Sequence, residues 1–520
     1  MKRICLTVIL LAAPGLAQEK IDLSAVHRIR AEALKNSKVM EHLFYLTDVH
    51  GPRLTGSPNF RAAADWAMRQ LKGWGCENVR TEKWGRFGRS WSFVRFAAHM
   101  IEPQRASIIG FPLAWSPGTG GLISGEPVLA PMPIDQSDEA LDKAMEKFKG
   151  KLRGKIVMIE TPRQIGLPTA PLARRYTDAD LAAEALAPDP EGEWPFAEPK
   201  PDRPWVQVEK RRLRRNQFLN QEGALLALTP GYRGDGGSIA ATQAGSRETS
   251  EPLPPPTAAI VAEHYNRIAR LLHHKIPVKL EFDIDTKIHE EEPDGYNVLA
   301  EIPGGRKKDE VVMLGGHLDS WIGGTGATDN ATGCAVVLEA IRILKTLDFK
   351  MDRTVRLALW SAEEGGLFGS KGYVKDHFAD PETMRLKPDH ARLAAYFNHD
   401  NGSGRIRGVY LQDNDMVRPI FAAWLEPFRD LGATTLTIRN TRGTDHVAFD
   451  EVGLPAFQFI QDPLDYSTRT HHSNMDVYDH VEAGELMQGA TIIASFVYHA
   501  ATREEMLPRK PLPKPKPKNQ

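Results

Sequence analysis

From residue 297 onward the chain alternates short apolar segments with amphipathic ones. EVVMLGG, TVRLALW, RLAAYF and PAFQFIQ are typical of buried strands, and CAVVLEAIRILKTL has the apolar spacing of a helix. Strands that alternate with helices pair in parallel and need cover on both faces, so the pattern predicts an α/β fold with a mostly parallel central sheet. Ligands of such sheets bind at the carboxyl ends of strands. The residues that follow these segments are therefore candidates for a functional site.

Histidines and carboxylates follow four of these predicted strands. The residues at the strand ends are, in chain order, His317, Glu363, Glu364, Asp400, His471 and His472. A lone histidine or aspartate in a loop is usually solvated or caps a helix, so one such residue would mean little. Four strand ends of this kind on one edge of a sheet are hard to explain as structure alone. They indicate a metal site.

Asp329 lies in the glycine-rich loop GGTGATDNATG, between the first of these strands and its helix. A phosphate-binding loop is excluded because the segment has no G-K-[ST] ending and no G-x-G-x-x-G in the right place. Thr332 or Asn330 is better placed to cap the helix, which frees Asp329 to point at the site. With Asp329 as a bridge, two histidines and three carboxylates would serve two zinc ions and leave room for a shared water or hydroxide.

The adjacent glutamates Glu363 and Glu364 are expected to divide the work. Neighbours on a regular strand point to opposite faces, so both would not bind one ion. One would bind metal, and the other would take the proton from the attacking water and pass it to the leaving amine. A surface acidic pair is the usual alternative, but it does not fit a position directly after the buried segment TVRLALW.

Three further residues are candidates for positioning or substrate contact. Asp319 lies two residues beyond His317, where it could accept the second N–H of that imidazole. Asp445 and His446 lie in GTDHVAFD, before the last strand, where either could border the substrate. A loop histidine that is satisfied by its own surroundings is as common.

Several motifs resemble, in order and spacing, those of the co-catalytic zinc aminopeptidase and glutamate carboxypeptidase family. They are GGHLDS, ATDNATG, SAEEGGLFGS, FNHD and HHSNMD, and GPRLTGSPNFRAAADWAMRQLKGWG resembles the family's N-terminal segment. The resemblance implies the zinc exopeptidase fold and two zinc ions per chain. It implies that His317 and Asp400 hold one zinc, that Glu364 and His472 hold the other, and that Asp329 bridges them.

The same resemblance implies roles for neighbouring residues. Glu363 would be the general base. The family's last metal ligand lies four residues before an aspartate, and Asp476 follows His472 at that distance, which favours His472 over His471. A tyrosine often assists the oxyanion in this family, and Tyr466 is the candidate here.

Composition divides the chain into five parts. Residues 1–17 have the basic start, apolar middle and small final residues of a signal peptide, which predicts cleavage near Ala17 and a secreted or periplasmic protein. Residues 117–279, with GKIVMIE and GALLALT, resemble a β-rich protease-associated domain inserted between the two peptidase segments 18–116 and 280–505. Residues 506–520 are dominated by proline and lysine, and we expect a disordered basic tail.

Charge and hydropathy limit the classes of binding partner that we expect. The 66 basic and 67 acidic residues give a formal net charge of -1, so nothing points to nucleic acid. No segment has the roughly 20 apolar residues needed for a membrane span. The sequence therefore predicts a secreted zinc-dependent exopeptidase that removes N-terminal residues from peptides or dipeptides through a metal-bridged hydroxide. The alternatives are a carboxypeptidase, a glutaminyl cyclase with one zinc, and a non-catalytic binding scaffold.

Overall fold

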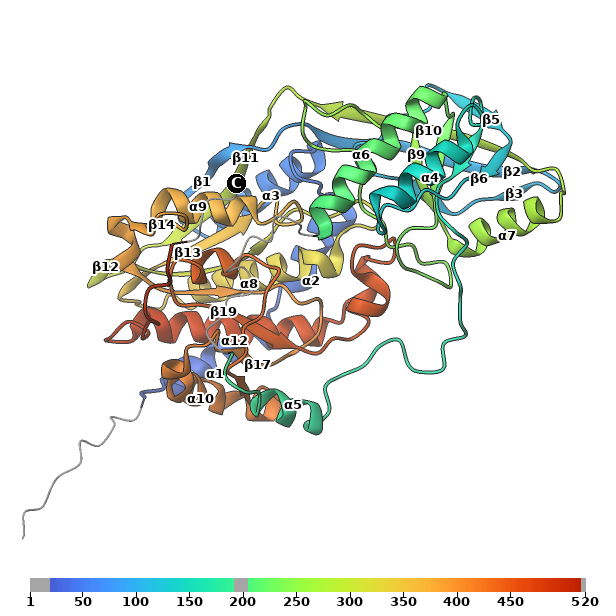
Figure 1. Ribbon diagram of the computed structural model, residues 1–520. Coiled ribbons are helices and arrows are strands. Elements are labelled where there is room, and N and C mark those ends of the chain that lie inside the picture. The colour runs from blue at the N-terminus through green and yellow to red at the C-terminus, as the bar shows by residue number, and fades with distance from the viewer. Residues whose placement is uncertain (1–18, 191–203, 516–520) are drawn as a thin grey trace, which may run out of the picture.

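The computed structural model describes residues 19–190 and 204–515 (Figure 1). Its largest unit is an eight-stranded sheet. The strands of this sheet are, in spatial order, β1 (Glu77–Arg86), β11 (Asp294–Ile302), β13 (Arg353–Trp360), β12 (Lys307–His317), β16 (Leu393–Asn398), β19 (Ala456–Gln461), β17 (Ile406–Tyr410) and β18 (Thr435–Thr437). The central neighbours β13, β12, β16 and β19 run parallel, whereas β11 and β17 join them antiparallel. The carboxyl ends of the central strands therefore share one edge.

Helices cover both faces of this sheet, because alternate strand residues point to opposite sides. Val312 and Leu314 of β12 pack into one apolar core, and Met313 between them packs into another. The helices on the first side are α1 (Leu23–Lys35), α2 (Val39–Phe44), α3 (Pro58–Gly73), α8 (Thr332–Thr346), α10 (Arg418–Leu425) and α12 (Ala483–Thr502), and those on the second are α9 (Phe368–His377) and α11 (His446–Asp450). A short hairpin of β14 (Ala379–Asp380) and β15 (Arg385–Leu386) follows α9. The predicted α/β fold with a mostly parallel central sheet is confirmed.

A second region forms the upper right of Figure 1 and contains two smaller sheets. One has the order β3 (Ala106–Ser107), β2 (Ser90–Glu102), β10 (Lys279–His289) and β5 (Leu122–Gly125); the other has the order β4 (Gly110–Pro112), β9 (Thr257–Ile260), β8 (Leu226–Thr229), β7 (Ile156–Met158) and β6 (Pro127–Leu129). The helices of this region are α4 (Asp138–Phe148), α6 (Pro204–Glu222) and α7 (Ala262–His273). Strands β2, β3 and β4 precede residue 117, and β10 begins at residue 279, so this region is wider than the range 117–279. Helix α5 (Asp178–Ala185) lies apart, against β18.

The two chain ends relate differently to the predictions. The predicted signal peptide lies outside the described residues. The tail differs from our expectation over its first residues: Leu507 is buried, Arg509 donates to the main-chain carbonyl of His390, and Lys510 pairs with Asp450 at 2.8 Å. Local composition could not show this, because the partners are more than fifty residues away in the sequence. Within 19–190 and 204–515, no helix combines the length and apolar character needed to cross a membrane.

Candidate metal centre

The first half of the site lies where β12 and β16 end. His317 is the last residue of β12 and is fully buried, and Asp400 follows β16 by two residues. The Nε2 atom of His317 lies 3.3 Å from a carboxylate oxygen of Asp400 and 3.2 Å from Oδ1 of Asp329. Asp329 comes from the turn Ala327–Ala331 between β12 and α8.

The second half of the site contacts the other carboxylate oxygen of Asp329. The Nε2 atom of His472 lies 3.2 Å from Oδ2 of Asp329 and 3.0 Å from a carboxylate oxygen of Glu364. Glu364 comes from the loop after β13, and His472 from the loop after β19. The structure thus brings the five predicted ligands together, with Asp329 between a His317 pair and a His472 pair.

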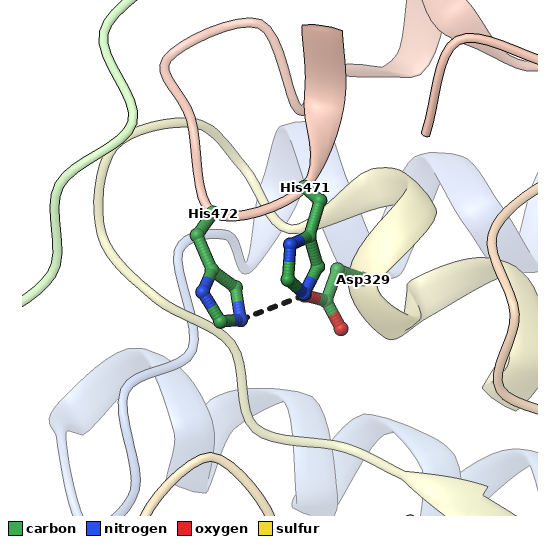
Figure 2. Close-up of side chains that lie close together, drawn as sticks. All are labelled: Asp329, His471 and His472. Atoms are coloured by element: carbon green, nitrogen blue, oxygen red, sulfur yellow. Dashed lines mark ion pairs between the residues drawn. The ribbon is translucent and has the colours of Figure 1, made fainter. Parts of the chain in front are cut away.

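The neighbouring histidines His471 and His472 both lie beside Asp329, as Figure 2 shows, but they differ in their other contacts. The two rings stack with their centroids 3.8 Å apart. The Nε2 atom of His471 lies 3.7 Å from Asp329, and no contact with Glu364 is present among the described residues, whereas His472 contacts both carboxylates. His472 also has a backbone φ of 57°, a value that is uncommon for a residue with a side chain. The geometry favours His472 as the ligand.

Unsatisfied polar atoms test whether these residues fit a metal ion. Among the described residues, Nε2 of His317, Oδ2 of Asp329 and Oε1 of Glu364 are buried and make no hydrogen bond. The donor atoms of His317, Asp329 and Asp400 lie within 4.8 Å of one another, and Asp329, His471 and His472 form a second such group. Imidazole nitrogens and carboxylate oxygens that converge without bonding to each other suit a divalent transition metal.

The electrostatics of the site fit the same conclusion. Burial raises the pKa of the Glu363 carboxyl well above its usual range, and Asp400 and Glu364 raise it further. Burial also raises the pKa of Glu364 to about 7, with Asp329 adding to the rise. Burial alone would raise the pKa of Asp329 too, but contacts with His317 and with the imidazole of the second pair hold it well below its usual range. A positive charge bound nearby would favour the ionised form of these buried acids.

Asp319 acts differently from our expectation. The Nδ1 atom of His317 lies 2.9 Å from the main-chain carbonyl of Asp319 and 3.6 Å from its carboxylate. The carboxylate instead accepts hydrogen bonds from Oγ1 of Thr55 at 2.8 Å and from the main-chain N–H of Glu363 at 3.3 Å. Thr55 in turn accepts from the N–H of Ala362 at 3.0 Å. The side chain of Asp319 therefore orients the glutamate loop, and its backbone orients the imidazole.

Arg53 is a residue of the site that sequence reasoning missed. It is fully buried and lies in the turn GPRLTGSPN. Its guanidinium donates to the main-chain carbonyls of Leu46 at 2.6 Å, Leu318 at 2.7 Å, Thr325 at 2.8 Å and Gly326 at 2.8 Å. It thereby ties the N-terminal helices to the loops that carry His317 and Asp329. An arginine in a turn gives no sequence signal of such burial.

The loop of Asp329 has a second support, in Asp476. The carboxylate of Asp476 accepts from the main-chain N–H and the hydroxyl of Thr328, at 2.5 and 2.8 Å. Its main-chain carbonyl accepts from the N–H of Thr325 at 2.8 Å. The spacing of Asp476 from His472 was used only to choose between two histidines, but the structure gives the residue contacts of its own.

The remaining candidates lie around the pairs. Asp445 is buried, burial raises its pKa to about 7, and the charge of His317 opposes that rise. The Nε2 atom of His446 lies 3.3 Å from the carbonyl of Thr441, and burial lowers the pKa of this histidine to about 4. His446 thus contacts its own loop through Nε2, whereas its buried Nδ1 has no hydrogen-bond partner among the described residues. Tyr466 packs its ring 4.9 Å from that of His471, with burial raising its pKa well above the usual value.

The second region also reaches the site, through the loop after β8. The main-chain N–H of Ala241 donates to the carbonyl of His472 at 3.2 Å, and Arg233 donates to the carbonyl of His471 at 2.8 Å. Burial raises the pKa of Tyr232, and the charge of His472 opposes that rise. These contacts hold the loop of the two histidines from outside the main sheet.

Comparison with known proteins identifies the class of protein that has this fold and site. The fold and the site define a metallo-exopeptidase. Residues 297–497 match the family model of Peptidase family M28. The predicted resemblance to co-catalytic exopeptidases is confirmed.

The relatives include both amino- and carboxypeptidases by name. Carboxypeptidase Q of Mus musculus is 26% identical over 472 residues, covering 90% of this chain and 87% of the relative. Aminopeptidase YwaD of Bacillus subtilis is 30% identical over 206 residues, covering 38% of this chain and 43% of the relative. Among solved structures, the Peptidase M28 precursor of Shewanella amazonensis matches with a TM-score of 0.66 and 23% identity, over 94% of this chain and 98% of that one. BSAP, a zinc aminopeptidase of Bacillus subtilis, matches with a TM-score of 0.52 and 17% identity, over 91% and 96%. The structural matches support the fold.

Proposed function

We propose that the chain is a zinc-dependent exopeptidase that hydrolyses peptides or dipeptides at a free N-terminus, with two zinc ions per chain. The observation that carries the proposal is the position of Asp329, whose two oxygens lie 3.2 Å from His317 and 3.2 Å from His472. A carboxylate between two histidine–carboxylate pairs suits a bridging ligand. A relative named as a zinc aminopeptidase supports the choice of metal.

Each residue has a defined task in this proposal. His317 and Asp400 would hold one ion, Glu364 and His472 the other, and Asp329 both. Zinc bound there would polarise the peptide carbonyl and lower the pKa of water. The carbonyl of Asp319 fixes the ring of His317 through Nδ1, as is usual for metal-binding imidazoles.

Proton transfer falls to Glu363 in the proposed reaction. Its carboxylate would take the proton of the attacking water and give it to the nitrogen of the leaving amine. Its main-chain N–H is held by the carboxylate of Asp319, so the residue is presented at a defined position beside Glu364. Tyr466, next to His471, is the candidate donor for the oxygen that becomes negative during attack.

A carboxypeptidase is the second candidate, and a specific observation favours it. The relatives that cover most of this chain are named Carboxypeptidase Q. The carboxylates of Asp329, Glu364 and Asp400 at the proposed metal site favour binding of a substrate amine instead. A cyclase with one zinc would leave one of the two pairs without a task, and a scaffold protein would need neither pair.

Hydrolysis of a matched peptide panel tests the proposal. Dipeptides with free amines would be compared with N-acetylated copies, each with and without a chelator. We expect chelator-sensitive cleavage of the free-amine set alone. Cleavage of the blocked set would replace the proposal by a carboxypeptidase, and no cleavage of either set would refute peptidase activity at this site.

The chain ends and the second region carry two further proposals. We propose export with cleavage after Ala17, on the pattern of residues 1–17; an N-terminus other than Gln18 in the exported protein would contradict this. We also propose that 117–279 is a protease-associated domain that restricts access to the proposed metal site. The hydrogen bonds of Arg233 and Ala241 to the carbonyls of His471 and His472, and the electrostatic contact of Tyr232 with His472, support this. If Tyr232→Ala leaves the ratio of dipeptide to decapeptide cleavage unchanged, the restriction does not exist.

A further inference from the structure

A separate cavity lies in the second region, at the carboxyl ends of β7 and β8. Its volume is about 450 Å³, within the range of small-molecule sites. Glu160 and Thr161 line it just beyond β7, Thr229 and Pro230 line it at the end of β8, and α6 contributes further side chains. Because β6, β7, β8 and β9 run parallel, the cavity occupies the position where open α/β sheets bind ligands.

Four arginines of helix α6 lie on two different faces of the helix. The segment RRLRR supplies Arg211 and Arg214, and Arg212 and Arg215, as two pairs spaced three apart, so each pair shares a helix face. Arg211 and Arg214 pair with Asp138 of α4 at 3.1 and 2.9 Å. Arg212 and Arg215 turn the other way and line the cavity. Helices α4 and α6 lie side by side (Figure 1).

The two cavity arginines are buried and only partly satisfied. The side chains of Arg212 and Arg215 are each 7% exposed. Arg212 pairs with Glu209 and lies 2.9 Å from the amide oxygen of Gln243 in its hydrogen-bonding orientation, whereas Arg215 reaches Glu160 at 3.4 Å. Within the described ranges, the Nε atoms of both arginines have no hydrogen-bond partner. A buried guanidinium with unused N–H groups is costly unless an acceptor completes it.

The cavity adjoins the metal centre through one loop. Tyr232 and Ala241 line the cavity. The main-chain N–H of Ala241 donates to the carbonyl of His472 at 3.2 Å. A ligand in the cavity would therefore lie against the loop that supports the backbone of His472.

We propose that this cavity binds a carboxylate, held by the guanidinium groups of Arg212 and Arg215. A planar guanidinium matches a carboxylate with two parallel hydrogen bonds. The cavity lining gathers three arginines, Arg163, Arg212 and Arg215, against two carboxylates, Asp135 and Glu160. The carboxylate has two sources: the C-terminus of a peptide bound at the metal centre, or a free carboxylate ligand. The site itself is independent of the proposed peptidase function, and only the first source rests on it.

Binding of small probes to the purified, metal-containing protein tests the site. Calorimetry would compare N-acetylalanine with N-acetylalaninamide, which lacks the carboxylate. We expect binding of the acid alone, and a loss of affinity of roughly 10- to 100-fold in Arg212→Gln and Arg215→Gln. Arg214→Gln, on the opposite face of the same helix, is the matched control and should bind as the natural chain does.

The acid could also bind at the metal ions, and the variants distinguish this. Equal affinity of the natural chain, Arg212→Gln and Arg215→Gln for the acid would overturn the proposal, as would equal binding of the amide by the natural chain. The comparison of acid and amide uses only the natural chain, so it tests the proposal even if a variant fails to fold. Arg215→Lys keeps the charge but not the paired geometry, and an intermediate affinity is expected.

Hydrolysis separates the two sources of the carboxylate. If the peptide C-terminus occupies the cavity, kcat/KM for Ala-Ala should exceed that for its C-terminal amide at least about tenfold, and this preference should disappear in Arg215→Gln. If the ligand is free, the preference should be the same in both proteins while N-acetylalanine binding is still lost. Absence of any hydrolysis would refute the proposed function and the peptide source, and the calorimetry would still decide the site.

Discussion

At the edge of the eight-stranded sheet, β12 and β16 end in His317 and, two residues further on, Asp400; at the edge of the five-stranded sheet, β7 and β8 end beside Arg212 and Arg215. Both places lie at the carboxyl ends of parallel strands, where loops meet and backbone is free to present side chains. The first gathers carboxylates and imidazoles, and the second gathers guanidinium groups. The shared architecture fixes where a ligand binds, and the side chains decide the sign of its charge.

The two places also differ in how they are supported. The candidate metal ligands are held in place by side chains from distant parts of the chain. Arg53 and Asp476 fix the Asp329 loop through main-chain contacts. The cavity arginines share one helix, and α6 alone sets their spacing. Changes at the first place should therefore spread to stability and metal content, whereas changes at the second should stay local.

The largest effect is expected from Glu363→Gln. The amide cannot accept the proton of the attacking water, so kcat should fall roughly 100- to 10,000-fold while zinc content and melting temperature stay the same. Steady-state kinetics and metal analysis of the purified protein measure this. Glu382→Gln, at an exposed glutamate in the loop before β15, is the control. Retained activity in the Glu363 variant would refute its role.

Next in size is the contrast between His472→Ala and His471→Ala. His472 contacts both Asp329 and Glu364, so its loss should remove one zinc and lower activity roughly 100-fold or more. Loss of His471, whose Nε2 lies 3.7 Å from Asp329, should retain both ions and lower activity only about tenfold. The two variants serve as controls for each other, and the reverse order would show that the ligand is misassigned.

A smaller effect, on stability, is expected from Arg53→Met. The change leaves the buried carbonyls of Leu46, Leu318, Thr325 and Gly326 without their donor. The free energy of unfolding in denaturant should fall by roughly 3–5 kcal/mol. Arg61→Met, which breaks an exposed pair with Glu292, should cost about 0–1 kcal/mol. Similar losses in the two variants would contradict the structural role of Arg53.

The smallest effect concerns a buried acid outside both sites. Burial raises the pKa of Asp450 to about 6, and Lys510 opposes the rise. Because the folded pKa exceeds the unfolded value of 3.8, the folded state binds more protons, and this group adds stability as pH falls from about 6 towards 4. Lys510→Met should destabilise the chain by about 1–3 kcal/mol at pH 8 and by less at pH 5, measured by chemical denaturation at both values. An equal loss at both pH values would show that the pair is not electrostatic.

The sequence could predict those parts of the structure that depend on the local pattern of apolar and polar residues. The strands before His317 and Asp400 are short, apolar and separated by helices, so their type and their shared edge follow from neighbours in the chain. The direction of Asp319 did not follow, because it depends on Thr55 from a distant turn. The burial of Arg53 escaped prediction for the same reason. Contacts between segments far apart in sequence leave no periodic signal.

The central claim is that Asp329 joins two zinc sites, and metal stoichiometry tests it most directly. Elemental mass spectrometry would count zinc in the purified natural chain and in Asp329→Ala, with circular dichroism as a check on folding. The account predicts two zinc ions per natural chain and a loss of affinity for both in the variant. One zinc or none in the natural chain, or two tightly held ions in a folded Asp329→Ala, would contradict it.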